Sequence, residues 1–274
     1  MKQGEVRKIL RDDNVRIGFE LECIFPAFFH DKRYKSGGYR YDSKYLFSIA
    51  VDYFKVNRLP FKAVFTEEYY YNNKNKWVIK PDNSIGAAGL ELVSPVMELE
   101  EYLDICPVIF SHMKKVKAVT DNKCGFHLNL SLKDKGWYNR LDVMKLGLLI
   151  NEREIYDLFP MRKNNTYCES VHKDIKKVLK KKIGEYILEN YKLKPEFTES
   201  HHMAINISHL KQKNKYIEFR YIGGKDYHKK WKDIKYLTAM FINAMRLACN
   251  KDTDIDCILR ISQLRRGNKE NAIM

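Results

Sequence analysis

The sequence predicts an α+β fold built around one antiparallel sheet. Several short runs alternate between apolar and polar residues and are rich in β-branched and aromatic side chains, as half-buried strands are. The turns between these runs are short and contain Gly, Asn and Pro, which favours antiparallel pairing. Segments with helical apolar spacing are interspersed with the strands, and a content of 18 Tyr and 14 Phe favours a sheet-rich core.

The first half of the chain is expected to supply most of the strands. Residues 15–25 (VRIGFELECIF) alternate and predict the first strand, and residues 43–57 predict an amphipathic helix with a serine cap. Three strand-like runs follow, separated by turn sequences, and together predict an antiparallel meander. These runs are expected at 61–72, 76–85 and 89–97, followed by a helix at 98–119 and a strand at 124–132.

The second half mixes helical segments with two further strands. Helices are expected at 139–159, 170–191, 231–250 and 252–264, and strands at 201–210 and 215–223. Because no repeat or linker divides the chain, the sequence predicts a single domain over residues 1–274. It would carry a lysine-rich helical insertion around 139–195 and C-terminal helices at 231–265.

The composition narrows the cellular setting and the partners. The six cysteines are scattered without a C-x-x-C pair, and no apolar run approaches the length of a membrane span, so we expect a soluble cytoplasmic protein with free thiols. The net charge of +15 favours anionic partners such as nucleotides, nucleic acid or an acidic polymer. A lysine-rich surface from a biased overall composition explains the same charge.

Acidic residues recur on the polar sides of the predicted strands. Glu20 and Glu22 are two apart on the first strand, so both face the same side of the sheet. Glu91 lies opposite its two leucine neighbours, and Asp82 lies in the turn sequence KPDNS. Taken singly, each is more often a solvated strand or turn residue than a ligand.

The later strands add polar residues of other kinds. His127 and Asn129 share the polar face of CGFHLNLSL, and Glu218 and Arg220 share a face of KYIEFRYIG. Asn206 offers a further polar position. A structural histidine and a simple ion pair are the plain interpretations. Together, however, crowded carboxylates on one face need compensating cations, and oxygen ligands with one imidazole suit Mg²⁺ or Mn²⁺.

In this order along the chain, the motifs resemble the amidoligase family of the glutamine synthetase-like carboxylate–amine ligases. Each motif is short, and the series spans roughly residues 15–225. The matching pieces are GFELE (18–22), PDNS with GLELVSP (81–95), CGFHLNL (124–130), FPMRKNNTYC (159–168), HHMAINI (201–207) and IEFRYIGG (217–224).

The resemblance implies a glutamine synthetase-like fold, with a curved antiparallel sheet and helices on its convex face, and a catalytic domain that uses ATP to activate a carboxylate as an acyl phosphate before an amine attacks. It implies Mg²⁺ or Mn²⁺ as cofactor. The implied metal ligands are Glu20, Glu22, Glu91, His127 and Glu218; the implied catalytic residues are Arg220, Arg162 and Glu218; Asn129, Tyr167, Asn206 and Asp82 would contact ATP or substrate. Asn129 departs from the family pattern, which often has a second histidine there.

Two other classes remain in view. The lysine-rich segment 171–192 is compatible with a nucleic-acid-binding protein without catalysis, although a solvated helix face explains it equally simply. A metal-dependent phosphoesterase or nuclease would share the acids and the histidine but would not need ATP. For the ligase, the partners would be small-molecule or peptide carboxylates and amines, with an acidic or nucleic-acid-linked substrate and an oligomer both compatible with the sequence.

Overall fold

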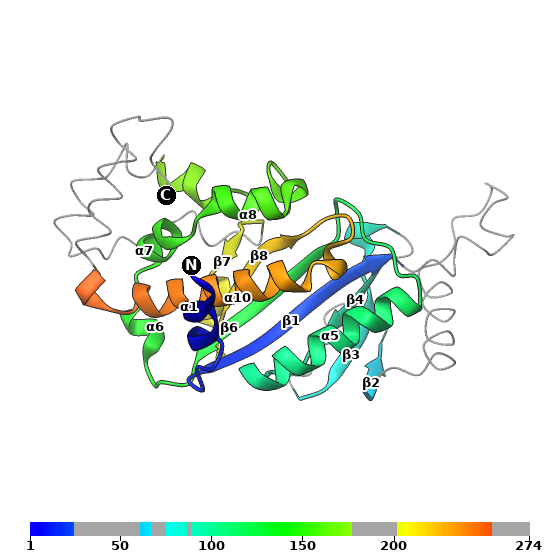
Figure 1. The fold of residues 1–274 in the computed structure, drawn as a ribbon, viewed down its shortest axis with the longest axis horizontal. Helices are drawn as coiled ribbons and strands as arrows, with labels where there is room; N and C mark the ends of the chain where they lie inside the picture. Colours follow the sequence, from blue (N-terminus) through cyan, green and yellow to red (C-terminus); the bar gives the residue numbers. More distant parts are fainter. Residues whose placement is uncertain (25–60, 67–74, 87–88, 177–201, 254–274) are drawn as a thin grey trace, which may run out of the picture.

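A computed structural model describes residues 1–24, 61–66, 75–86, 89–176 and 202–253 (Figure 1). The helix expected at 43–57 lies outside the described residues, as do most of the lysine-rich helix at 170–191 and of the helix at 252–264. No helix among the described residues is long and apolar enough to cross a membrane.

The strands form one open, mostly antiparallel sheet in the order β2-β3-β4-β1-β6-β8-β7, with β5 paired to the beginning of β1. The predicted α+β class is therefore confirmed. The strands are β1 Val15–Ile24, β2 Ala63–Phe65, β3 Trp77–Pro81, β4 Gly89–Val93, β5 Met97–Glu98, β6 Gly125–Leu132, β7 Ile205–Asn206 and β8 Ile217–Gly223.

The predicted meander is wrong at one place, because β2 pairs with β3 in parallel, whereas β3 and β4 pair antiparallel as expected. Strand β1, whose neighbours the sequence did not predict, lies between β4 and β6. The segment between β2 and β3 is much longer than a two-residue hairpin, and it has the length that a parallel crossover needs. Turn composition alone could not reveal where the first strand would insert, because that position depends on contacts distant in sequence.

The helices are α1 Gln3–Ile9, α5 Leu99–Lys115, α6 Trp137–Arg140, α7 Val143–Leu149, α8 Glu152–Leu158 and α10 Trp231–Ala248. The single helical segment expected at 139–159 is divided, because Asn151 breaks it and caps α8 by accepting from the Glu154 backbone N–H. The strand expected at 201–210 is only two residues long, and a 3₁₀ turn at Ser208–Lys211 follows it.

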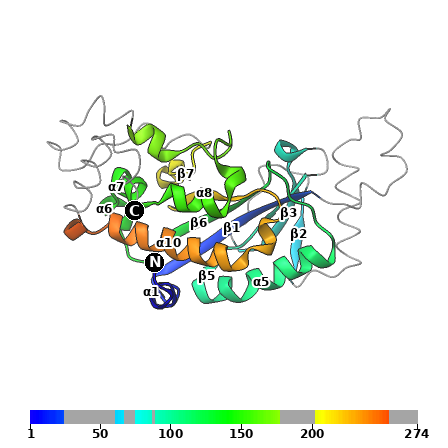
Figure 2. The ribbon, with the colours of Figure 1, turned by 45° about the horizontal axis from the view of Figure 1, so that its top comes forward.

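Helices α5 and α10 run side by side over one face of the sheet, and α1 lies against α10 (Figures 1 and 2). Aromatic rings join these layers: Phe19 of β1 contacts Tyr102 of α5, with ring centroids 6.0 Å apart, and Tyr102 contacts Trp231 of α10 at 5.7 Å. In β8, Phe219 stacks on Phe241 of α10 at 4.5 Å. Since side chains alternate along a strand, residues flanking these rings point to the opposite face. That face carries the acidic residues.

Candidate functional site

Strand register brings three of the predicted residues together. Glu20 of β1 pairs with His127 of β6, and Glu218 of β8 pairs with Asn129, which is two residues from His127 on the same face of β6. His127 Nδ1 lies 3.4 Å from a Glu20 carboxylate oxygen and 3.3 Å from a Glu218 carboxylate oxygen. One ligand atom from each of the three residues lies within 4.8 Å of the others, so they could hold one cation. We call them the Glu–His–Glu cluster.

The other nitrogen of His127 faces Glu22. Its Nε2 lies 3.5 Å from Glu22 Oε1, and Glu22 Oε2 accepts the backbone N–H of Gly125 at 2.6 Å. A histidine that ligates a metal usually donates its second ring N–H to a carboxylate, which fixes the tautomer and the ring orientation. Glu22 is placed to do this for His127 and lies outside the Glu–His–Glu cluster.

Glu218 is held from both sides. Arg220 Nη1 donates to one carboxylate oxygen at 2.5 Å, and Asn206 Nδ2 donates to the other at 2.7 Å. Burial alone would raise the pKa of Glu218, but the Arg220 guanidinium and hydrogen bonds from His209 and Asn206 hold it below its usual value. The carboxylate therefore stays ionised, as a metal ligand must be.

The pKa of Glu20 is also set by burial and hydrogen bonding acting in opposite directions. Burial would raise its pKa, but hydrogen bonding to His127 and Asn129 gives a net lowering. Asn129 Nδ2 donates to Glu20 Oε1 at 3.1 Å, whereas the buried Asn129 Oδ1 has no hydrogen-bond partner among the residues that the structure describes. A buried amide oxygen beside the cluster is available to a bound cation or to a donor group of a ligand.

Glu91 has a different partner. In the antiparallel β3–β4 pair it lies across from Lys80, whose Nζ is 3.0 Å from Glu91 Oε2, and in the β1–β4 pair it lies across from Glu22. Burial and the negative charge of Glu20 raise the pKa of Glu91 well above its usual value, and Lys80 offsets part of that shift. Sequence reasoning missed Lys80, although its alternation with the flanking apolar residues of β3 places it on the same face.

Arg162 and Tyr167 lie behind Arg220. Arg162 is fully buried and donates through Nε and Nη2 to the Arg220 carbonyl oxygen, at 3.2 and 2.7 Å. The Tyr167 carbonyl oxygen accepts from Arg220 Nε at 3.2 Å. Both residues therefore position the backbone or the guanidinium of Arg220. Asp82 is buried in the turn after β3 and accepts from the Ser84 backbone N–H at 2.9 Å, away from the Glu–His–Glu cluster.

His209 is a neighbour that sequence reasoning missed. Its Nε2 lies 3.4 Å from Glu218 Oε2, and its ring stacks on Tyr216 with centroids 4.2 Å apart. Treating 201–210 as one strand hid this contact, because the strand ends at Asn206 and the 3₁₀ turn carries His209 back over Glu218. The feature of the sequence that could have indicated this contact is the three-residue spacing between Asn206 and His209, because side chains three apart come together in a 3₁₀ turn.

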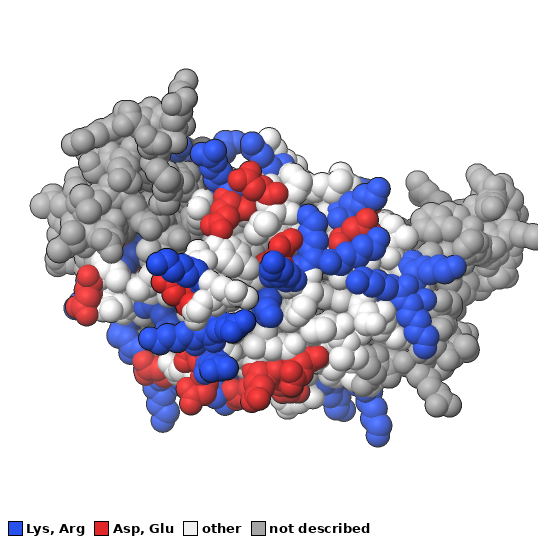
Figure 3. Space-filling model, in the orientation of Figure 1, with Lys and Arg blue, Asp and Glu red and all other residues white. Residues whose placement is uncertain are grey.

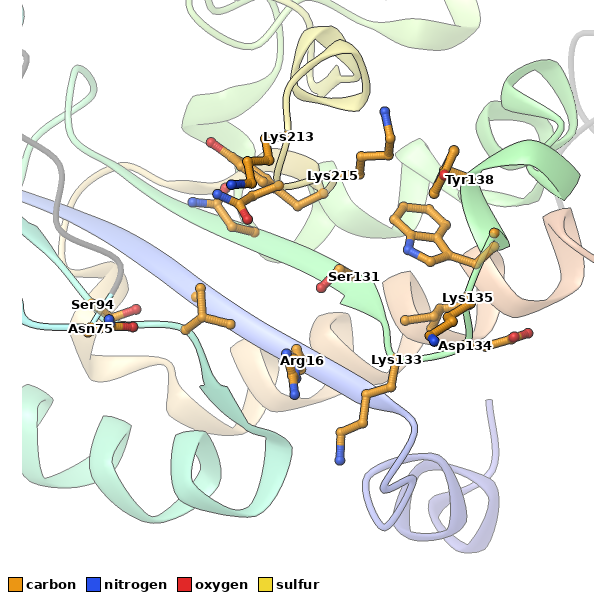
Figure 4. A pocket seen from close by; sticks show the side chains of 18 of the residues that line it. Arg16, Asn75, Ser94, Ser131, Lys133, Asp134, Lys135, Tyr138, Lys213 and Lys215 are labelled. Carbon is orange, nitrogen blue, oxygen red and sulfur yellow. The ribbon is translucent and has the colours of Figure 1, made fainter.

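A pocket of about 700 Å³ is lined by residues of β1 and β6, and Glu20 is the member of the Glu–His–Glu cluster that lines it. Gly18, Asn129, Ser131 and Tyr216 also line it. Its far end is basic, with Lys133 and Lys135 just beyond β6 and Lys213 and Lys215 across from them (Figure 4). The Lys215 ammonium lies 4.5 Å from the centre of the Tyr138 ring. The pocket is thus lined by Glu20 of the Glu–His–Glu cluster and also by several lysines.

On the face shown in Figure 3, lysines and arginines among the described residues are scattered between acidic groups. The described part of this face therefore lacks the continuous basic surface that favours binding of a nucleic-acid backbone.

Two of three comparisons with known proteins found a match. A family model described as "Putative amidoligase enzyme" matches residues 13–241. Among solved structures, glutamine synthetase of Plasmodium falciparum is similar, with 14% sequence identity and a TM-score of 0.38. The alignment covers 89% of this chain and 55% of that chain, so this chain spans about half the length of that enzyme. No curated protein matches the sequence.

Proposed function

This chain belongs to the amidoligase family, and on that premise we propose that it joins a carboxylate to an amine in a reaction that depends on ATP and Mg²⁺, through an acyl phosphate. The observation that carries the proposal is the convergence of Glu20, His127 and Glu218 on one possible cation site, of which Glu20 also lines the pocket. A free carboxylate resists attack by an amine, and phosphorylation converts one of its oxygens into a leaving group.

The Glu–His–Glu cluster fits a divalent cation. Two carboxylates and one imidazole are a donor set that Mg²⁺ and Mn²⁺ accept, and the unpartnered Asn129 Oδ1 adds a nearby oxygen. When bound, such a cation supplies positive charge against the phosphate oxygens. The protein's own contribution is rigidity, because Asn206 fixes Glu218 and Glu22 orients the His127 ring.

The long pocket fits a nucleotide. Its volume of about 700 Å³ is within the usual range for ligand sites, about 300–1,000 Å³. Because Glu20 lines the pocket, a ligand that fills it also reaches the cluster. The Tyr216 and Tyr138 rings and the Ser131 hydroxyl are groups that contact bases and sugars well.

Arg220 is the proposed stabiliser of charge during phosphoryl transfer. A planar guanidinium suits the oxygens of a phosphoryl group or an acyl phosphate. Glu218 and the Tyr167 carbonyl hold its side chain, and Arg162 holds its backbone. Such a group does not need to reorganise as charge develops, which is the main source of electrostatic catalysis.

The finer parts of the proposal follow from the family. They are a glutamine synthetase-like arrangement with helices on the convex side of a curved sheet, a single catalytic domain, and a cytoplasmic setting. The substrates are proposed to be a small-molecule or peptide carboxylate and an amine. The basic pocket end favours ligands with phosphate or additional carboxylate groups.

Amine-dependent ADP release tests the proposed function. Purified protein is given ATP, Mg²⁺ and pools of amino acids and amines, and ADP is measured with and without the amines. We expect Glu20→Ala and Glu218→Ala to abolish the release. Glu101→Ala is the matched control, because Glu101 is exposed on α5. Full turnover in both site variants would show that the acidic face has been assigned wrongly.

A further inference from the structure

Within the described part of the chain, the acidic face has more carboxylates than lysine or arginine side chains paired with them. It contains four carboxylates, of which Glu22, Glu91 and Glu218 are buried and Glu20 is partly buried. Two permanent cations pair with them: Arg220 with Glu218 at 2.5 Å and Lys80 with Glu91 at 3.0 Å. Glu20 and Glu22 have no lysine or arginine partner within salt-bridge distance among the described residues, so a cation at the Glu–His–Glu cluster would lie beside uncompensated carboxylates. Buried charges need such compensation.

The geometry separates the four carboxylates into two groups. Glu20 and Glu218 converge on His127 Nδ1 and form the Glu–His–Glu cluster. The oxygens of Glu22 are directed to the Gly125 N–H and to His127 Nε2. Glu91 therefore has no second carboxylate free to share a cation with it among the described residues, and Lys80 is its charged partner.

Lys80 lies on the same face of the sheet as Glu22 and Glu91. It is the cross-strand partner of Glu91, which in turn is the cross-strand partner of Glu22, so the three side chains form one row on the same face. The Lys80 side chain is 14% exposed and that of Glu91 is 11% exposed. Strand β3 is paired on both sides, by β2 and β4, and a lysine this well covered has little freedom to leave its partner.

We propose that this site binds one divalent cation, at the Glu–His–Glu cluster, and that the Lys80 ammonium occupies the position beside Glu91 where a second cation would otherwise bind. The inference deepens the proposed function and rests on it for the presence of a cation. It departs from the sequence-based expectation that Glu22 and Glu91 are metal ligands. An ammonium supplies one charge and three directional donors, so it can hold a carboxylate or phosphate oxygen without acting as a Lewis acid.

Counting bound Mn²⁺ tests the inference without any activity measurement. The full chain is titrated with Mn²⁺ in the absence of nucleotide, because nucleotides bring a cation of their own, and free Mn²⁺ is followed by electron paramagnetic resonance. We expect one tight site per chain. Glu218→Gln should weaken it by more than about tenfold. Glu91→Gln should change it by no more than about threefold.

The lysine is tested by a matched pair of variants. Lys80→Gln removes the charge and should allow a second Mn²⁺ to bind, whereas Lys80→Arg keeps the charge and should leave one. Two tight sites in the unsubstituted protein, or the loss of a tight site in Glu91→Gln, would overturn the inference. If Lys80→Gln fails to fold by circular dichroism, the unsubstituted protein and Glu91→Gln decide the question. Counting bound Mn²⁺ does not require turnover. A failure of this inference can therefore be distinguished from a failure of the proposed ligase activity, which amine-dependent ADP release measures.

Discussion

Gly125 is where the architecture of the site is least tolerant of change. It is the first residue of β6, and its N–H donates to Glu22 at 2.6 Å. A Cβ added at this position would lie 2.5 Å from His127 Nε2 and 3.2 Å from Glu22 Oε2. Ordinary contact begins near 3.4 Å, so the imidazole would have to move by about 0.9 Å, the difference between 3.4 and 2.5 Å.

Gly125→Ala should therefore damage the cation site and cost stability. Overpacking of a buried position typically costs about 1–3 kcal/mol, and a misplacement of about 1 Å in a catalytic group can cost about 100-fold in rate. The free energy of unfolding is measured by urea denaturation, and cation binding by Mn²⁺ titration. We expect both to fall, with Mn²⁺ affinity reduced by more than about tenfold.

Gly4→Ala is the matched control for the same substitution. Gly4 lies in α1, and a Cβ there would meet no atom within 4 Å. Because alanine favours a helix over glycine, this variant should gain up to about 1 kcal/mol and bind Mn²⁺ normally. If Gly125→Ala matches Gly4→Ala in stability and in Mn²⁺ affinity, the described packing of His127 against the start of β6 is wrong.

Three further outcomes follow from the same contacts. Because the folded-state pKa of Glu218 is depressed, the ionised carboxylate stabilises the fold above the usual pKa of 4.5, and this stabilisation is lost as pH falls below it. The free energy of unfolding, measured by urea denaturation, should therefore fall less with decreasing pH in Glu218→Gln than in the unsubstituted protein, and an equal fall in both would contradict the assignment. Tyr227→Phe removes the donor that reaches the Glu22 carbonyl oxygen at 2.7 Å and should cost about 1–3 kcal/mol, whereas an unchanged midpoint would show that this bond contributes nothing. Nucleotide affinity should fall with added salt, and less steeply in Lys135→Gln combined with Lys213→Gln; equal salt dependence would mean that the basic pocket end does not face the ligand.

Strand alternation predicted which side chains share the functional face. The parities of Glu20 with Glu22, and of Glu218 with Arg220, follow from the two-residue period of a strand and need no tertiary information. The family resemblance added the order of the motifs. Both sources identified Glu20, His127 and Glu218 before any contact was known.

Register and chain reversal could not be predicted from local sequence. The irregular register near His127 arises from pairing between β6 and β8, whose residues are about 90 positions apart in the chain. The pairing of Lys80 with Glu91 likewise depends on the register of β3 against β4, and the return of His209 depends on a strand that ends after two residues. The two strand registers and the chain reversal bring residues that would otherwise only share a face of the sheet into contact with one another.

Transfer of an isotope from substrate to phosphate tests the central claim most directly. The protein is incubated with ATP, Mg²⁺, an amine pool and amino acids whose carboxylates carry ¹⁸O, and the released phosphate is analysed by mass spectrometry. An acyl phosphate places one carboxylate oxygen in each phosphate released during amide formation, so we predict phosphate with a single ¹⁸O. Released phosphate that carries no ¹⁸O would contradict the account and indicate a phosphohydrolase.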